Sequence, residues 1–272
     1  MKNPLLNLLS LTALAAASTA VLAAPLAFNQ NVTPGIIFGS ENANGAFTVD
    51  RANNIELGLR GKLRHDATGQ PQNIFNSNGD GTYSFATGVA PTQSAPTGVW
   101  SFEWSINTDL SGTGGGKLGA LTYQMGIDSD ASQGVNYGVF DLIKGVNLGV
   151  GVVCWDHSTG TNTTTAANDQ TANCGAGNAN RVSDYAAELA NNNVAQNSWK
   201  ASWFIPGYDP TVDGTYNFFL AAFDSSGAQR ARTDIQIIAG NGGAAVIPEP
   251  ASLALVGLAL GGLAFTRRRR NS

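Results

Sequence analysis

Residues 55–64 read IELGLRGKLR, and the spacing within this stretch decides the fold class. Its apolar residues fall on one side of an extended chain: Ile55, Leu57, Leu59 and Leu63. Its charged residues fall on the other side: Glu56, Arg60, Lys62 and Arg64. This period of two is typical of a β-strand that buries one face, because successive side chains of a strand point to opposite sides. We therefore expect a half-buried strand with its charged side in solvent.

The same alternation recurs along the chain. Residues 100–107 (WSFEWSIN) place a large apolar side chain at every second position. Five further segments are expected to form strands: 121–127, 146–154, 198–205, 215–223 and 232–238. Gly-rich and Asn-Gly turn signals separate the strands, and a helix is expected only over 183–191. Many short strands with one apolar face predict an all-β fold, an antiparallel β-sandwich of the jelly-roll or immunoglobulin-like kind.

A six-residue pattern, Asp-Gly-Thr-Tyr-x-Phe, occurs twice, at residues 80–85 and 213–218. Each copy places an Asp-Gly turn before an aromatic strand. We interpret the pattern as a hairpin device used twice. It does not indicate a repeated domain, because the flanking residues do not continue the similarity.

The N-terminal residues 1–24 have the layout of a secretory signal peptide. Lys2 precedes an apolar stretch from Pro4 to Leu22, and the small residues Ala23 and Ala24 follow as cleavage positions. An uncleaved anchor helix is the alternative. We expect the secretion machinery to export the chain and signal peptidase to remove the leader.

The C-terminal end combines an apolar segment with a basic cluster. Residues 251–266 read ASLALVGLALGGLAFT and contain no charge. Four arginines follow directly: Arg267, Arg268, Arg269 and Arg270. This pattern predicts a single transmembrane helix with its arginines in the cytoplasm and the preceding body outside the inner membrane. A soluble core helix is the alternative, although the segment has no polar face.

Pro248, Glu249 and Pro250 stand immediately before that segment. Two prolines around one residue hold the backbone extended and accessible to a processing enzyme. Taken in order, the Pro-Glu-Pro triplet, apolar helix and arginine cluster of residues 246–272 resemble the PEP-CTERM sorting domain. The resemblance implies that an exosortase of a Gram-negative, polysaccharide-producing bacterium processes the tag. The protein would then be anchored transiently in the inner membrane before it reaches the cell surface or the extracellular space.

Removing both ends leaves one secreted β domain, residues 25–245. Over residues 25–247 the lysines and arginines number 10, which is 15 minus the five in the terminal segments, and the acids number 18, which is 19 minus Glu249. The body therefore has a net charge of −8. An acidic body argues against a nucleic acid partner, because binding phosphates requires a basic surface.

The chain has two cysteines, Cys154 and Cys174. In an exported protein such a pair predicts a disulfide, which here would close a loop rich in Thr, Asn and Gly. The alternative joins both cysteines with His157 as metal ligands, although zinc sites usually need four ligands. We expect no metal and no cofactor.

Two groups of polar residues were considered as sites of chemistry. Asn76, Asn78, Asp80 and Gly81 have the spacing of a calcium loop, but the twelfth position is Thr87, so a solvated turn is the simpler interpretation. A second group comprises three acids, Asp128, Asp130 and Asp141, which either form a glycosidase pair or cap loops. No hydrolase motif accompanies His65 or His157, so we expect no enzyme activity.

Two aromatic residues outside the alternating segments suggest a ligand site. Trp155 lies in the loop between the cysteines and Tyr208 in Pro-Gly-Tyr-Asp-Pro. Exposed aromatic rings on the loops of a β-sandwich stack on sugar rings, so both residues are candidates for glycan binding. The alternative is that both rings pack against the edge of a sheet.

The body also resembles a group of PEP-CTERM proteins in several segments, among them residues 31–34, 38–45, 123–143, 196–199 and 219–224. That resemblance implies no enzyme activity. The sequence therefore predicts a non-catalytic cell-surface or extracellular-matrix protein associated with exopolysaccharide or biofilm. A carbohydrate-binding module of the matrix is the alternative, and a glycan-active hydrolase is a third hypothesis.

Overall fold

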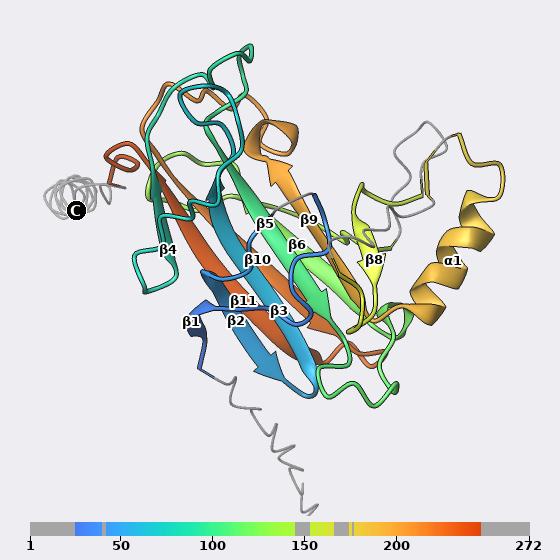
Figure 1. The fold of residues 1–272 in the computed structure, drawn as a ribbon. Helices are drawn as coiled ribbons and strands as arrows, with labels where there is room; N and C mark the ends of the chain where they lie inside the picture. Colours follow the sequence, from blue (N-terminus) through green and yellow to red (C-terminus); the bar gives the residue numbers. More distant parts are fainter. Residues whose placement is uncertain (1–24, 40–41, 145–152, 166–173, 176, 246–272) are drawn as a thin grey trace, which may run out of the picture.

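The computed structural model describes residues 25–39, 42–144, 153–165, 174–175 and 177–245, and these residues form two β-sheets (Figure 1). The first sheet has the strand order β1-β2-β3-β5-β9-β8, and each neighbouring pair is antiparallel. Its strands are β1 (Ala27–Gln30), β2 (Phe47–Ala52), β3 (Ile55–Leu63), β5 (Trp100–Asn107), β8 (Ser158–Gly160) and β9 (Val194–Lys200).

The second sheet has the order β4-β11-β10-β6-β7. Its strands are β4 (Thr82–Phe85), β6 (Thr122–Asp128), β7 (Tyr137–Phe140), β10 (Gly214–Phe223) and β11 (Gln229–Ala239). The pair of β4 and β11 is parallel, so the prediction of purely antiparallel sheets is wrong for this pair. A parallel pair needs a long connection, which the chain between these two strands supplies.

One hydrophobic core lies between the two sheets. Leu57 and Leu59 of β3 belong to the same buried cluster as Leu220 of β10. The rings of Phe102 on β5 and Phe218 on β10 lie 4.7 Å apart, centroid to centroid, and so join the two sheets directly. The all-β prediction is therefore confirmed. Its finer part, a jelly-roll or immunoglobulin-like sandwich, stays a prediction.

The repeated Asp-Gly-Thr-Tyr-x-Phe pattern forms two strands that flank β11. The first copy enters β4 and the second enters β10, and both strands pair with β11. The tyrosine and the phenylalanine of both copies are buried in the core: Tyr83, Phe85, Tyr216 and Phe218. The pattern thus marks two strands of one sheet that share a neighbour.

Strand predictions from alternation are confirmed for β3, β5, β6, β10 and β11, with ends that differ by at most three residues. The predicted helix is α1 (Arg181–Asn191), which buries Tyr185 and Leu189 four residues apart on one face. It lies beside β8 at one end of the first sheet (Figure 1). Of the expected strand 146–154, residues 146–152 lie outside the described residues, and Val153 and Cys154 are not in a strand.

The expected strand 198–205 is wrong in its second half. Strand β9 begins earlier and ends at Lys200, and a 3-10 turn, η3 (Ala201–Trp203), follows it. The amide N–H groups of Phe204 and Ile205 both donate to the carbonyl of Ala201. The turn packs the partly buried Phe204 against the core and leaves the adjacent Trp203 exposed. Trp203 and Phe204 are two large aromatics in succession, which breaks the alternation of a strand. This break in the pattern indicates that the strand ends before them.

The charged side of β3 is not in solvent, contrary to the sequence-based expectation. Glu56, Arg60 and Lys62 are buried. The segment of residues 31–45, of which 40 and 41 are not described, passes over this outer face, and we call it the cover segment. It is joined to the strands by hydrogen bonds such as Ile37 N–H to Gln196 Oε1 at 2.9 Å. The first sheet is therefore covered on both faces at this point.

The leader and the tag, residues 1–24 and 246–272, lie outside the described residues, so their predicted roles stay predictions. In the part of the chain that the structure describes, no helix is both long and apolar enough to cross a membrane.

Candidate functional site

A groove with a volume of about 480 Å³ opens on the outer face of the first sheet, next to the cover segment. Its lining comes from Phe38 and Asn42 of the cover segment, from β3, β5 and β9, and from the loop that begins at Cys154. The volume lies within the range of small-ligand sites. The groove is therefore a candidate binding site.

The floor of the groove is a network of charged side chains. Lys62 Nζ donates to Asn42 Oδ1 at 2.5 Å and lies 3.5 Å from Glu103 Oε1. Arg60 Nε donates to the other oxygen of Glu103 at 2.6 Å. Burial lowers the pKa of Lys62, and the nearby Glu103 carboxylate opposes that shift. The single carboxylate of Glu103 is thus shared by two cations.

Arg64 and His65 follow the end of β3 and line one side of the groove. Arg64 Nη1 donates to Ser198 Oγ on β9 at 3.0 Å. His65 Nδ1 lies 3.2 Å from the carbonyl oxygen of Gly69. Since a carbonyl only accepts, Nδ1 carries the proton and Nε2 of the neutral ring is an acceptor. Burial lowers the pKa of His65, and the charges of Lys200 and Arg64 add to this effect.

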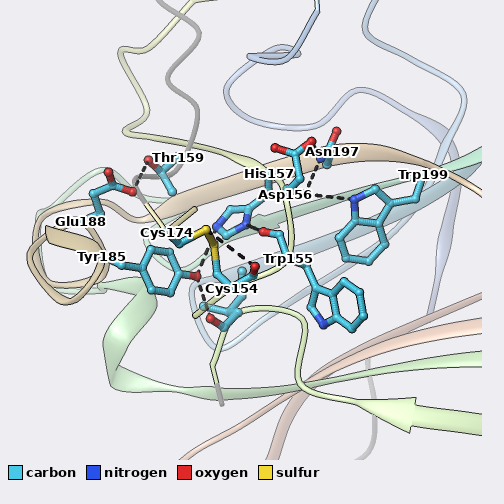
Figure 2. The surroundings of a disulfide bond; sticks show 11 residues. Cys154, Trp155, Asp156, His157, Thr159, Cys174, Tyr185, Glu188, Asn197 and Trp199 are labelled. Carbon is cyan, nitrogen blue, oxygen red and sulfur yellow. Dashed lines mark hydrogen bonds between the residues drawn. A yellow bond between two sulfur atoms is a disulfide. The ribbon is translucent and has the colours of Figure 1, made fainter. Parts of the chain in front are cut away.

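The opposite wall comes from the loop after Cys154. The backbone carbonyl of Asp156 accepts hydrogen bonds from Asn197 Nδ2 at 2.5 Å and from Trp199 Nε1 at 3.0 Å (Figure 2). These bonds tie the loop to β9 and leave the Asp156 carboxylate exposed at the rim. The wall therefore presents a carboxylate and an amide side by side.

A disulfide between Cys154 and Cys174 anchors this loop, as the sequence predicted. His157 lies beside it, with Nδ1 2.6 Å from the carbonyl oxygen of Trp155 and Nε2 3.3 Å from the hydroxyl of Tyr185 on α1 (Figure 2). Complete burial lowers the pKa of His157 to about 4, so the ring is neutral. The alternative metal site is wrong, because the two sulfur atoms are bonded to each other.

Trp203 stands at the mouth of the groove. Its side chain is 55% exposed, and the Nζ atom of Lys200 lies 5.8 Å from its ring centroid. The 3-10 turn η3 holds it there, while Phe204 stacks on Trp199 at 4.7 Å in the core. A large flat ring in solvent beside hydrogen-bonding groups can stack on a ligand ring.

The two aromatics that the sequence singled out are packed against other aromatic rings. Tyr208 is 7% exposed and lies at 5.8 Å from the ring of Trp100, so the expectation that it is exposed is wrong. Trp155 is partly buried against Phe140 and Phe204. The alternative interpretation, in which both rings pack against the sheets, fits these contacts better than exposed rings do. Their glycan-binding role has no support from their positions.

The three acids considered for hydrolysis cap loops. Asp128 is fully buried, and its carboxylate accepts from the backbone N–H groups of Asp130 and Asn136 at 3.0 and 2.8 Å. Asp141 accepts from the N–H groups of Ile143 and Lys144 at 2.8 and 2.7 Å. Carboxylates that are satisfied in this way stabilise turns.

The other acid of that group, Asp130, accepts from the N–H of Ser132 at 2.9 Å. The loop considered for calcium is a hydrogen-bonded turn of the same kind. Asp80 accepts from the N–H and the hydroxyl of Thr82, and Asn78 Nδ2 donates to the same hydroxyl at 2.8 Å. Both loops therefore use their polar side chains to hold their own backbone.

Comparison with known protein families matched residues 246–270 to the family described as the PEP-CTERM protein-sorting motif. The chain carries a PEP-CTERM sorting motif. The matched range contains Pro248, Glu249 and Pro250 together with the apolar segment and the arginines. The resemblance seen in the sequence is thereby confirmed. No curated protein and no solved structure matched the chain.

The PEP-CTERM motif implies that the protein is exported, that an exosortase processes it and that it is sorted to the surface. The matched motif covers residues 246–270 and includes no residue of the body. The groove is the feature of the body that bears on its function.

Sequence reasoning did not find Trp203, Arg64 or His65 as site residues. Arg64 was assigned to the solvent side of a strand, and Trp203 was assigned to a strand interior. Two signals were available: the consecutive Trp203 and Phe204, and the basic run at residues 60–65 (RGKLRH). Neither signal shows by itself that the two segments lie on the same face of one sheet.

Proposed function

We propose that the body is a non-catalytic carbohydrate-binding protein of the cell surface or extracellular matrix, and that its groove holds exopolysaccharide. The sorting motif supports a surface location. The observation that carries the binding role is the exposed ring of Trp203 at the mouth of a groove of about 480 Å³. An aromatic platform beside polar side chains is how proteins bind sugar rings.

The polar side chains around the groove suit hydroxyl groups. Asn197 and Asp156 at one wall offer an amide and a carboxylate, and Ser198 offers a hydroxyl. On the other wall, the neutral ring of His65 offers an acceptor. Sugars need this mixture of donors and acceptors, because each hydroxyl both donates and accepts. The loops of Asp128 and Asp141 lie outside the lining of the groove.

The route to that location follows the terminal segments. Signal peptidase removes residues 1–24, and the segment 251–266 anchors the chain transiently in the inner membrane of a Gram-negative bacterium with the arginines in the cytoplasm. The exosortase then releases the body to the surface or matrix. These steps rest on the sequence of the two ends and on the matched motif.

A glycan array tests the binding role. The full-length chain, solubilised in mild detergent, should retain a subset of polysaccharides, and Trp203→Ala should lose this retention. Tyr137→Ala is a matched control, because Tyr137 is a partly exposed aromatic on β7 of the other sheet. Equal retention by wild type and Trp203→Ala would contradict the groove as the site.

The proposal that the protein is not catalytic is tested on the same glycans. Release of reducing ends is measured over many hours at several pH values. We expect none above the background of a heat-unfolded sample. Turnover that disappears in Asp128→Asn or Asp141→Asn would instead support the hydrolase hypothesis.

A further inference from the structure

The groove brings cationic side chains together on an acidic body. Lys62 and Arg64 line it, and Lys200 lies next to it against the ring of Trp203. The carboxylates among its described lining residues are Glu103 on the floor and Asp156 at the rim. The body as a whole has an excess of eight acids, whereas this lining carries as many cations as carboxylates. Lys62 engages Glu103, so the cation left to attract an anion is Arg64.

Arg64 is the cation best placed to meet a ligand. It lines the groove, and Ser198 holds its Nη1 through the hydroxyl at 3.0 Å. No ion pair joins Arg64 to a carboxylate within the described residues, whereas Arg60 and Lys62 both engage Glu103. A guanidinium has five N–H donors in a planar fork that matches a carboxylate, and most of those on Arg64 have no protein acceptor there.

His65 supplies an independent sign of a ligand. Its ring is 8% exposed, and Nε2 is buried without a hydrogen-bond partner among the described residues. Because Nδ1 faces the carbonyl of Gly69, Nε2 is an acceptor that lacks a donor. A buried polar atom without a partner is uncommon, and a ligand hydroxyl would satisfy it.

We propose that the groove binds an acidic saccharide, in which a uronate carboxylate pairs with Arg64, a ring hydroxyl donates to Nε2 of His65 and a sugar face stacks on Trp203. This inference rests on the proposed carbohydrate-binding function and adds the chemical class of the sugar. A neutral glycan would leave the Arg64 guanidinium without an anionic partner. A free inorganic anion would use neither the ring of Trp203 nor the acceptor of His65.

Calorimetric titration with two matched probes tests the inference. The probes are oligogalacturonate and its carboxyl-reduced form, which keeps the chain length and hydroxyl groups but has no charge. The full-length chain in mild detergent should bind the uronate at least about tenfold more tightly, as expected for a charged hydrogen bond. The preference should shrink as salt is raised.

Variants separate the three contacts. Arg64→Gln should remove the preference for the uronate over the reduced probe, and Arg64→Lys should keep part of the preference. His65→Leu should weaken both probes, because both carry hydroxyl groups. Arg230→Gln is the charge-matched control, because Arg230 lies on β11 and lines no part of the groove. Unfolding curves check that each variant is folded.

The outcomes distinguish this inference from the proposed function. Equal affinity for both probes, or an equal loss in Arg64→Gln and Arg230→Gln, overturns the acidic-saccharide assignment while carbohydrate binding stands. If neither probe binds and no glycan on the array is retained, the proposed function fails and this inference fails with it. Tight binding of the uronate that Trp203→Ala does not affect overturns the proposed geometry.

Discussion

Arg60 and Glu103 form a buried ion pair at directly opposed positions of β3 and β5, and neither side chain is accessible to solvent. The guanidinium is held between two aromatic rings, 4.2 Å from the centroid of Phe47 and 3.8 Å from that of Phe75. Its Nη1 also donates to the carbonyl of Gly45 in the cover segment at 2.6 Å. The pair therefore joins two strands to the segment that lies over them.

The first prediction concerns this pair. Glu103→Gln should lower the free energy of unfolding by about 3–5 kcal/mol, because it leaves the charge of Arg60 buried without a partner. The triple change Arg60→Met, Lys62→Met and Glu103→Leu should recover much of the loss, because it also removes both cations that share the carboxylate. Denaturant unfolding measures all three proteins. As a control, removing the exposed pair of Arg230 and Asp224 should have little effect.

The second prediction concerns the disulfide. Replacing Cys154 and Cys174 by alanine should lower the free energy of unfolding by about 3 kcal/mol, because the bond closes a loop of 20 residues in the unfolded chain. Thermal unfolding with and without reductant is the measurement. Reduction should not change the melting temperature of the alanine variant. Two reactive thiols in the untreated, exported protein would contradict the disulfide.

The third prediction is a pH dependence. Burial lowers the pKa of His157 to about 4, whereas in the unfolded chain it is about 6.5. Between these values the unfolded state binds a proton that the folded state does not, so stability falls as the pH falls from about 6.5 to 4. The loss from this group is about 3 kcal/mol.

Comparison with His157→Gln isolates that contribution from the titration of carboxylates. The difference in unfolding free energy between wild type and variant should diminish as the pH is lowered from 7 to 4.5. His65→Gln is a second comparison, because burial also lowers the pKa of His65. This variant measures how much of the pH dependence comes from that residue. A constant difference between wild type and His157→Gln across this range would exclude the proposed titration.

The fourth prediction concerns Asp128. Its buried carboxylate accepts from two backbone N–H groups and from Asn217 Nδ2 at 2.9 Å. Asp128→Ala should therefore destabilise the protein by at least about 2 kcal/mol, since several buried donors lose their acceptor. Chemical denaturation provides the measurement. Glycan binding at 25 °C should persist as long as the variant is folded, because Asp128 does not line the groove.

The fifth prediction concerns the sorting motif. Replacing Pro248, Glu249 and Pro250 by alanine should prevent processing and leave the protein in the inner-membrane fraction. Cell fractionation with an antibody against the body measures this. Changing Ala251 to Gly leaves the triplet intact and is the control. Normal release of the triple variant would show that sorting does not depend on the triplet.

The sequence predicted those parts of the fold that depend on local alternation. Strands β3, β5 and β10 follow from every second residue being apolar, and Cys154 has only Cys174 as a possible partner. These inferences needed only the geometry of an extended chain and the count of cysteines.

The sequence could not predict which segment covers which face. The pattern of β3 shows that Arg60 and Lys62 point away from the core, but not that residues 31–45 return over them. The groove could not be predicted either. It is formed by the cover segment together with strands that are distant from it in sequence. Trp203 and Arg64 are separated by 139 positions and line the same groove. Only the pairing of β3 with β5 and of β5 with β9 brings them to one face.

The position of β11 has a consequence for the timing of folding during export. This strand is an interior member of its sheet, between β4 and β10, yet it is the last strand among the described residues and ends at Ala239. The matched sorting motif begins at residue 246, seven positions later. On the export route proposed above, neither the sheet nor the core can close until almost the whole body has left the translocation channel. The core would then close only as the sorting signal itself arrives.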